Sequence, residues 1–137
     1  NAVKATDGGV TYAEWSYAKD NKLGIAQIDN GSGPVELTGE SVGKAVTAAT
    51  QTGQGNDLKL KLDYATKEAG AYPILLVTYE IVCSKSKSKD SAKAPLTTAF
   101  LKSFAAADMQ TKLQTIGYAP LPAEIQAKVT TAIDALS

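Results

Sequence analysis

The sequence predicts an α/β fold, with α+β as the alternative, because short strands are mixed with amphipathic helices. Three observations indicate this class. Residues 70–83 form an apolar run that is too short to cross a membrane, and its apolar residues cover both faces, as in a central strand under helices. Residues 58–63 alternate between apolar and charged side chains, as in a strand with one wet face. Apolar residues recur at helical spacing over much of the C-terminal third.

The N-terminus is expected to contain two short helices separated by a strand. Residues 2–5 could end a helix before the glycine pair at residues 8–9, and residues 10–12 predict a short strand. The next helix is expected over residues 13–21, with Gly24 just past its end.

A hairpin and a capped helix follow. Residues 24–28 and 34–37 are short apolar runs on either side of an Asn-Gly turn, a combination that favours a hairpin. Thr38 is expected to cap a helix that runs through residue 49. A glycine-containing loop then leads to the alternating strand at residues 58–63.

The C-terminal half is expected to contain the central strand and three helices. Pro73 cannot donate a ladder hydrogen bond, so it is placed at the entry of the strand. Each large apolar side chain of this strand contributes about 1.5–3 kcal/mol when fully buried. Pro95 is expected in the first turn of a helix capped by Asp90 or Ser91. The expected apolar stripes are Leu96, Phe100, Leu101 and Phe104 in that helix, Met109, Leu113 and Ile116 in a second helix ending at Gly117, and Ile125, Val129, Ile133 and Leu136 in a last helix over residues 123–136.

Composition restricts the chemistry. The 137 residues suit one globular domain, with 44% hydrophobic and 20% charged residues and a formal net charge of zero. The chain has no His, which excludes Ser-His and Cys-His nucleophile activation and disfavours transition-metal sites. It has no Arg and no basic excess, so bidentate anion capture and a nucleic-acid partner are not expected. No cofactor is predicted.

Two carboxylates and one thiol are the candidates for chemistry. Glu80 interrupts the apolar strand and is expected to reach a cleft or meet a Lys; the alternative is a general acid or base whose second member is not visible. Glu14 lies on a predicted helix beside Trp15. Cys83 is expected to be a small buried hydrophobe, and the alternatives are a reactive thiol or a disulfide to another chain.

Other polar segments favour structural roles. Lys59 and Lys61 are expected on a solvated strand face rather than in an anion site. Residues 31–33 and 53–56 match neither P-loop nor GxGxxG spacing and predict turns, while residues 84–90 predict a solvated loop and not a phosphate cradle. Seven aromatic residues could stack on a ligand, but without interleaved basic residues they favour core and hinge packing. They are Tyr12, Trp15, Tyr17, Tyr64, Tyr72, Tyr79 and Tyr118.

Three motifs carry a resemblance to a known family. They are DGGVTYAEWSYA at residues 7–18, YPI at residues 72–74 followed by an apolar strand with Tyr79, and GYAPLP at residues 117–122. In this order they resemble PstS-type phosphate-binding proteins, the extracytoplasmic receptors of the phosphate ABC importer, over nearly the whole chain. Residues 71–84 are most similar to the actinobacterial lipoprotein members.

The resemblance implies part of a two-lobed periplasmic-binding-protein fold of type II, with hinge-crossing strands and the ligand in the cleft. Residues 1–70 would be the C-terminal part of the second lobe. Residues 71–137 would be the returning strand and closing helices of the first lobe. A strand at that return is covered by helices on both faces, which would explain the apolar run.

The resemblance also implies that the phosphate ligands lie outside this chain. The family holds phosphate with hydroxyls and amides at helix N-termini, an Asp, and an Arg ahead of a Ser-Gly-Thr turn. This chain has no Arg and no Ser-Gly-Thr, so no phosphate-binding, catalytic or metal-binding residue is assigned to it. The ligand residues are expected upstream of Asn1, where the absence of an initiator Met is typical of a processed or excised segment.

The expected function is phosphate capture by hinged closure, without catalysis. The expected partners are inorganic phosphate, the N-terminal part of the same protein and ABC permease subunits, in an extracytoplasmic location with a lipid anchor at the N-terminus of the whole protein. One alternative is an interaction or antigenic module that keeps the fold without transport. Another is a phosphatase whose acid and base lie upstream. Without upstream neighbours, the strand at residues 72–83 is expected to expose an apolar patch and to make the segment aggregation-prone.

Overall fold

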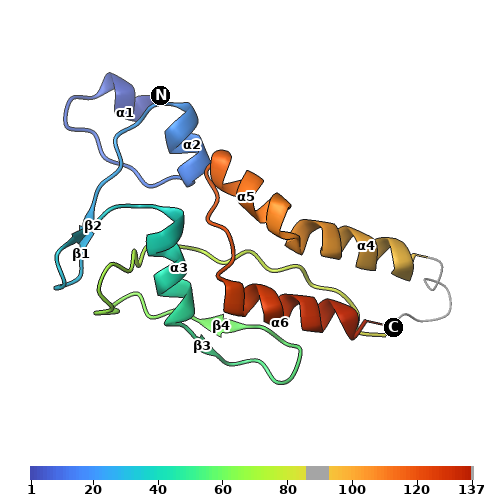
Figure 1. The fold of residues 1–137 in the computed structure, drawn as a ribbon. Helices are drawn as coiled ribbons and strands as arrows, with labels where there is room; N and C mark the ends of the chain where they lie inside the picture. Colours follow the sequence, from blue (N-terminus) through green and yellow to red (C-terminus); the bar gives the residue numbers. More distant parts are fainter. Residues whose placement is uncertain (86–92, 137) are drawn as a thin grey trace.

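A computed structural model of the chain describes residues 1–85 and 93–136, with six helices and four short strands in these ranges (Figure 1). The helices are α1 (Ala2–Ala5), α2 (Trp15–Asp20), α3 (Gly39–Thr47), α4 (Ala94–Ala105), α5 (Ala107–Thr115) and α6 (Ala123–Asp134). The strands are β1 (Ile28–Asp29), β2 (Pro34–Val35), β3 (Thr50–Gln51) and β4 (Leu60–Lys61). This mixture fits a fragment of the predicted α/β class.

The hairpin forms where the sequence predicts it, although it is shorter than expected. β1 and β2 pair antiparallel, with Ile28 opposite Val35 and Asp29 opposite Pro34. The Asp29 Oδ1 atom accepts hydrogen bonds from the backbone N–H groups of Gly31, at 2.7 Å, and Gly33, at 3.1 Å. Both glycines have positive φ, so the turn needs residues without a Cβ.

The alternating strand at residues 58–63 forms a ladder only over β4, which pairs antiparallel with β3. The sequence did not predict β3. Its two residues lie where a helix was expected to end and a loop to begin. A two-residue ladder carries too little sequence pattern to identify.

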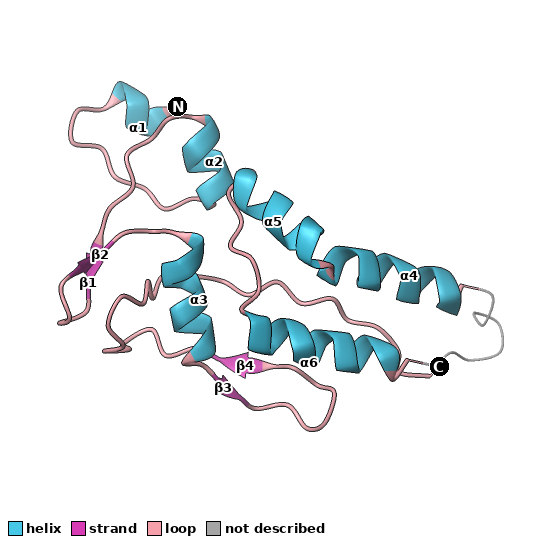
Figure 2. Cartoon of the chain, viewed as in Figure 1, coloured by secondary structure: helices cyan, strands magenta, loops and turns pink. Residues whose placement is uncertain are grey.

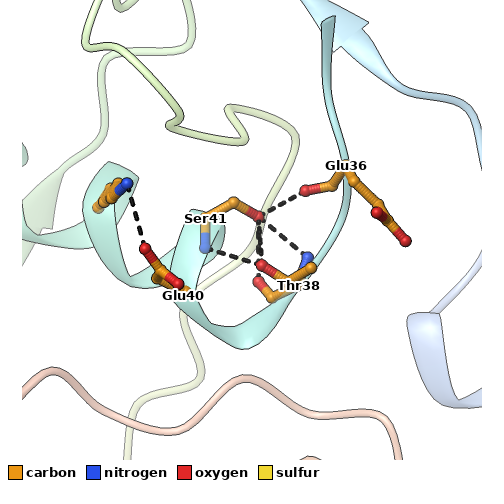
Figure 3. Close-up of polar contacts among 5 residues, drawn as sticks. Glu36, Thr38, Glu40 and Ser41 are labelled. Atoms are coloured by element: carbon orange, nitrogen blue, oxygen red, sulfur yellow. Dashed lines mark hydrogen bonds and ion pairs between the residues drawn. The ribbon is translucent and has the colours of Figure 1, made fainter.

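Thr38 caps α3, as predicted (Figure 3). Its hydroxyl accepts from the Ser41 N–H at 3.0 Å, and the Thr38 N–H donates to the Ser41 hydroxyl at 2.9 Å. The Ser41 hydroxyl also donates to the Glu36 carbonyl at 2.6 Å, which ties the helix start to the end of β2. The buried side of α3 carries the first core cluster, in which Val42, Val46 and Tyr72 pack with Ile28, Val35, Leu37, Leu60, Leu75, Ala119 and Ile125.

A second core cluster joins α4 to α6. Leu101 and Ala105 pack against Ile133, with Val129 and Leu136 alongside. The predicted stripe on α4 is therefore only partly buried, because Leu101 faces α6 while Leu96, Phe100 and Phe104 remain exposed.

The sequence predicts the start of α6 correctly but not the start of α4. α4 begins at Ala94 with Pro95 in its first turn, and its N-cap is Lys93 without a side-chain cap. The cap expected at Asp90 or Ser91 is wrong for this helix start, and these two residues themselves lie outside the described ranges. α6 begins at Ala123, as predicted.

The end of α2 differs from its prediction. Lys22, and not Gly24, adopts the left-handed conformation, with φ of 53°. The Lys22 N–H donates to Lys19 O at 3.0 Å, and the Leu23 N–H donates to Ala18 O at 2.9 Å, so the turn closes two residues before the glycine. A non-glycine residue at this position is strained.

Two predicted strands, at residues 10–12 and 70–83, belong to no ladder among the described residues. Figure 2 shows both segments as loops. The chain exposes 9587 Å², whereas a compact monomer of this mass exposes about 6,800 Å². Both segments have strand sequences, but a strand needs a neighbour to accept its backbone hydrogen bonds.

Candidate functional site

The main candidate site is the apolar segment at residues 71–83. Tyr72 anchors its start: the side chain is 6% exposed, and its N–H donates to Ser41 O at 3.0 Å. The Tyr72 hydroxyl donates to Ala26 O at 3.4 Å, and burial raises the pKa of this phenol above its ordinary value of 10.0. Further along, the Leu60 N–H of β4 donates to the Tyr79 hydroxyl at 2.8 Å. The segment is therefore held to the rest of the chain at two tyrosines.

The two faces of this segment differ between its anchors. Leu75 and Val77 are half-buried, and Leu75 packs on the first core cluster. Ile74 and Leu76 point to the other face and are 61% and 83% exposed. Among the described residues, no backbone hydrogen bond joins residues 74–83 to a neighbouring segment. Between its two tyrosine anchors, the apolar segment therefore has one partly covered face and one exposed face, and its backbone pairs with no strand among the described residues.

A second apolar surface lies on α4. Leu96, Phe100 and Phe104 are 73%, 61% and 40% exposed, and the two phenylalanine rings stack with their centroids 6.2 Å apart. Exposed aromatic residues at helical spacing form a surface that normally packs against another element.

The predicted carboxylates and thiol do not form a chemical site in the described chain. Glu80 is exposed and makes no ion pair with another described residue, so its expected Lys partner is not seen in this structure. Glu14 is exposed at the N-cap of α2 and forms no side-chain cap. Cys83 is a free, exposed thiol, so its predicted burial is wrong here. The reason is that the strand around it is unpaired and uncovered.

The lysine pair is exposed and the two glycine-containing segments form turns, as the sequence predicts. Lys59 and Lys61 are both exposed. Residues 31–33 form the hairpin turn, and residues 53–56 form a turn in which Gly55 has φ of 59°. Most of the predicted polar loop at residues 84–90 lies outside the described residues.

The aromatic residues do not gather into a stacking platform. Among the described residues, only Phe100 and Phe104 form an aromatic pair, and neither was among the seven candidates. Tyr12 is 95% exposed, while Tyr72 is buried. Within residues 1–85 and 93–136, no three His, Cys, Asp or Glu side chains lie close enough to hold a metal ion.

A crevice of about 610 Å³ lies between α2, the link from β2 to α3, and the end of α5, and the sequence did not predict it. Its lining includes Trp15, Lys19, Lys22, Glu36 and Gln114. The Lys19 ammonium donates to Thr115 O at 2.7 Å across one side of it. No motif marks these residues, because they come from elements far apart in the sequence.

None of the helices in the described ranges has the length and apolarity needed to span a bilayer.

Comparisons with known proteins point to one family. A family model described as a PBP superfamily domain matches residues 1–108. The phosphate-binding protein PstS 3 of Mycobacterium tuberculosis is 44% identical over 140 residues, which cover 99% of this chain and 37% of that protein. The phosphate-binding protein PstS 2 of the same organism is 43% identical over 139 residues, covering 98% of this chain and 37% of that protein.

A more distant relative is the phosphate-binding protein PstS of Xylella fastidiosa, 29% identical over 121 residues that cover 88% of this chain and 32% of that protein. No solved structure matches the chain. The chain spans about a third of the length of these curated relatives. The three motifs that resemble PstS-type proteins therefore agree with the sequence identity to named phosphate-binding proteins, which extends over almost the whole chain.

Proposed function

The chain belongs to the PBP superfamily, and we propose that it forms the C-terminal scaffold and hinge portion of a receptor for inorganic phosphate. The observation that carries this proposal is the 44% identity over 99% of the chain to a protein named as phosphate-binding. In this role the chain binds no phosphate itself. It positions a second part of the receptor, which supplies the ligand residues.

The apolar segment supports a scaffold role for this chain and a ligand-binding role for the rest of the receptor. It is tied down by Tyr72 and Tyr79, yet its backbone pairs with no described strand and the side chains of Ile74 and Leu76 are exposed. A polypeptide that adds strands along this backbone would satisfy the backbone groups and cover the apolar face. The remaining two thirds of a receptor of the relatives' length is the partner that we assign to this surface.

The proposed boundary between lobes is residue 70, with residues 71–137 in the first lobe. The receptor would act outside the cytoplasm, attached by a lipid anchor at the N-terminus of the whole protein, and would deliver phosphate to ABC permease subunits. It would work by closing two lobes around the anion and would catalyse no reaction.

The test is isothermal titration of the natural full-length polypeptide that contains this sequence. We expect heat of binding with phosphate and a much weaker response with sulfate. The 137-residue chain alone should give no phosphate signal. A full-length protein without phosphate heat would refute the receptor function, whereas phosphate binding by the 137 residues alone would refute the placement of the ligand residues.

A further inference from the structure

The tip of the β1–β2 hairpin carries a chemically reactive pair, Asn30 and Gly31. The Gly31 nitrogen can attack the Asn30 Cγ atom, because glycine has no side chain to obstruct the approach. The attack forms a cyclic succinimide and releases ammonia, and water then opens the ring to Asp or to isoaspartate. No other asparagine of the chain precedes a glycine. Asn30 is therefore the asparagine that the sequence makes most reactive toward deamidation.

The structure occupies the attacking nitrogen. The Gly31 N–H donates to Asp29 Oδ1 at 2.7 Å, and the Gly33 N–H donates to the same atom at 3.1 Å. The Gly31 nitrogen becomes a nucleophile only after it loses this proton. A carboxylate that accepts the hydrogen bond stabilises the protonated nitrogen and disfavours an anion beside it. Asp29 therefore opposes the first step of the reaction.

The structure also holds the leaving group. The Asn30 Nδ2 atom donates to Tyr64 O at 3.3 Å and to Thr66 O at 3.2 Å. Both partners are carbonyl oxygens, so the end of the side chain that faces them is the amide nitrogen. This nitrogen must leave as ammonia, so both bonds have to break during the reaction. The Lys67 ammonium donates to Asn30 O and adds a third link between the turn and this loop.

Deamidation would break the contact between the hairpin and the loop. The product carboxylate has no donor, and it would face the Tyr64 and Thr66 carbonyl oxygens in place of the Asn30 amide. An isoaspartate would also lengthen the backbone inside the turn. The hairpin supplies Ile28 and Val35 to the first core cluster, so the loss of this contact affects residues that pack on the core.

We propose that Asn30 is a deamidation site whose reaction the folded chain suppresses, with Asp29 holding the nucleophile and two loop carbonyls holding the leaving amide. The reaction consumes water and needs no other reactant. It proceeds when the hairpin opens or the chain unfolds, and its product lacks the contacts that hold the hairpin to the loop. This inference does not depend on phosphate binding.

The test compares deamidation of the natural full-length polypeptide in its native state and unfolded in guanidinium chloride, at the same pH and temperature. Mass spectrometry of the tryptic peptide 23–44 gives the fraction of Asn30 converted over time. We expect the native protein to react at least about tenfold more slowly than the unfolded protein, because several hydrogen bonds must open first. Equal rates in the two states would refute the proposal.

Two substitutions test the role of Asp29, each measured as the native rate divided by the unfolded rate. Asp29→Ala removes the acceptor of the Gly31 N–H and should raise this ratio by at least about fivefold, whereas Asp29→Asn keeps an acceptor oxygen and should raise it less. The matched control is Asp57→Ala, because Asp57 Oδ1 also accepts a backbone N–H, from Lys59 at 3.2 Å, but lies outside the hairpin. A ratio for Asp29→Ala equal to that of the control would overturn the proposal. If Asp29→Ala does not fold, Asp29→Asn is compared with the same control and decides in the same way.

The effect of the product is tested with Asn30→Asp in urea unfolding. Its matched control is Asn56→Asp, which adds the same charge at an exposed residue. We expect Asn30→Asp to lower the ratio of folded to unfolded protein by about 5- to 30-fold, through loss of the two carbonyl contacts, and the control to change it much less. Equal effects of the two substitutions would show that the Asn30 amide does not hold the hairpin to the loop, contrary to the proposal.

Discussion

Replacement of Leu76 by Ala measures whether the apolar segment is covered in the complete protein. Leu76 is 83% exposed in the described chain. Full burial of a Leu side chain contributes about 1.5–3 kcal/mol, so covering the exposed fraction would contribute about 1.2–2.5 kcal/mol. A cavity term adds to this in a closed core, which brings the expected cost of Leu76→Ala to about 2–5 kcal/mol in the full-length protein.

The assay is urea unfolding of the natural full-length polypeptide, with Leu101→Ala as the matched control. Leu101 is 8% exposed within the α4–α6 cluster, so its replacement should also cost about 2–5 kcal/mol. A Leu76 that stays exposed would behave as a surface residue, and its replacement would change the free energy of unfolding by no more than about 0.5 kcal/mol. A result near that value, together with a normal cost for Leu101→Ala, would refute the assignment of a covering partner.

Three further substitutions test local features. Lys22→Gly should raise the free energy of unfolding by about 1 kcal/mol, because it relieves a left-handed backbone at φ of 53°; a destabilised variant in thermal unfolding would contradict this. Thr38→Ala should lower the free energy of unfolding by about 1 kcal/mol through loss of the α3 cap, while Thr47→Ala at the exposed end of the same helix should cost less in the same urea titration. Because the Tyr72 pKa is raised, folding favours the neutral phenol; this contribution is complete below pH 10 and declines as pH rises through the native pKa. Urea unfolding between about pH 9 and pH 11 should therefore show a decline in wild type that Tyr72→Phe reduces, and identical slopes in the two proteins would count against it.

The sequence predicted those features that depend on neighbouring residues. Thr38 identified the start of α3 because the capping bonds join residues three apart. Gly117 identified the end of α5 because the left-handed turn needs a glycine at that position. The hairpin between β1 and β2 followed from an Asn-Gly turn between two apolar runs. In each case the bonding partner is within a few residues.

Features that depend on distant residues were predicted less well. The apolar segment has the composition of a central strand, but composition does not say which chain provides its neighbours. Cys83 was placed in the interior for the same reason, and it is exposed because that strand has no ladder here. The crevice beside Lys19 and Gln114 could not be found from the sequence, since its walls meet only after folding. Lys22 was missed because Gly24, two residues later, gave the stronger signal for a helix end.

The exposed surfaces of the chain are of two kinds, and they suit different surroundings. The apolar segment and the stripe of Leu96, Phe100 and Phe104 are apolar and partly lack hydrogen-bond partners, as in a permanent interface that resembles a divided core. The outer faces of α5 and α6 carry exposed ion pairs instead, Asp108 with Lys112 at 3.9 Å and Glu124 with Lys128 at 3.0 Å.

Such exposed pairs contribute little to stability, and a polar face of this kind stays soluble when its partner leaves. In the proposed receptor, the apolar surfaces therefore suit a lasting contact with the rest of the polypeptide, whereas the polar faces of α5 and α6 suit exposure to water.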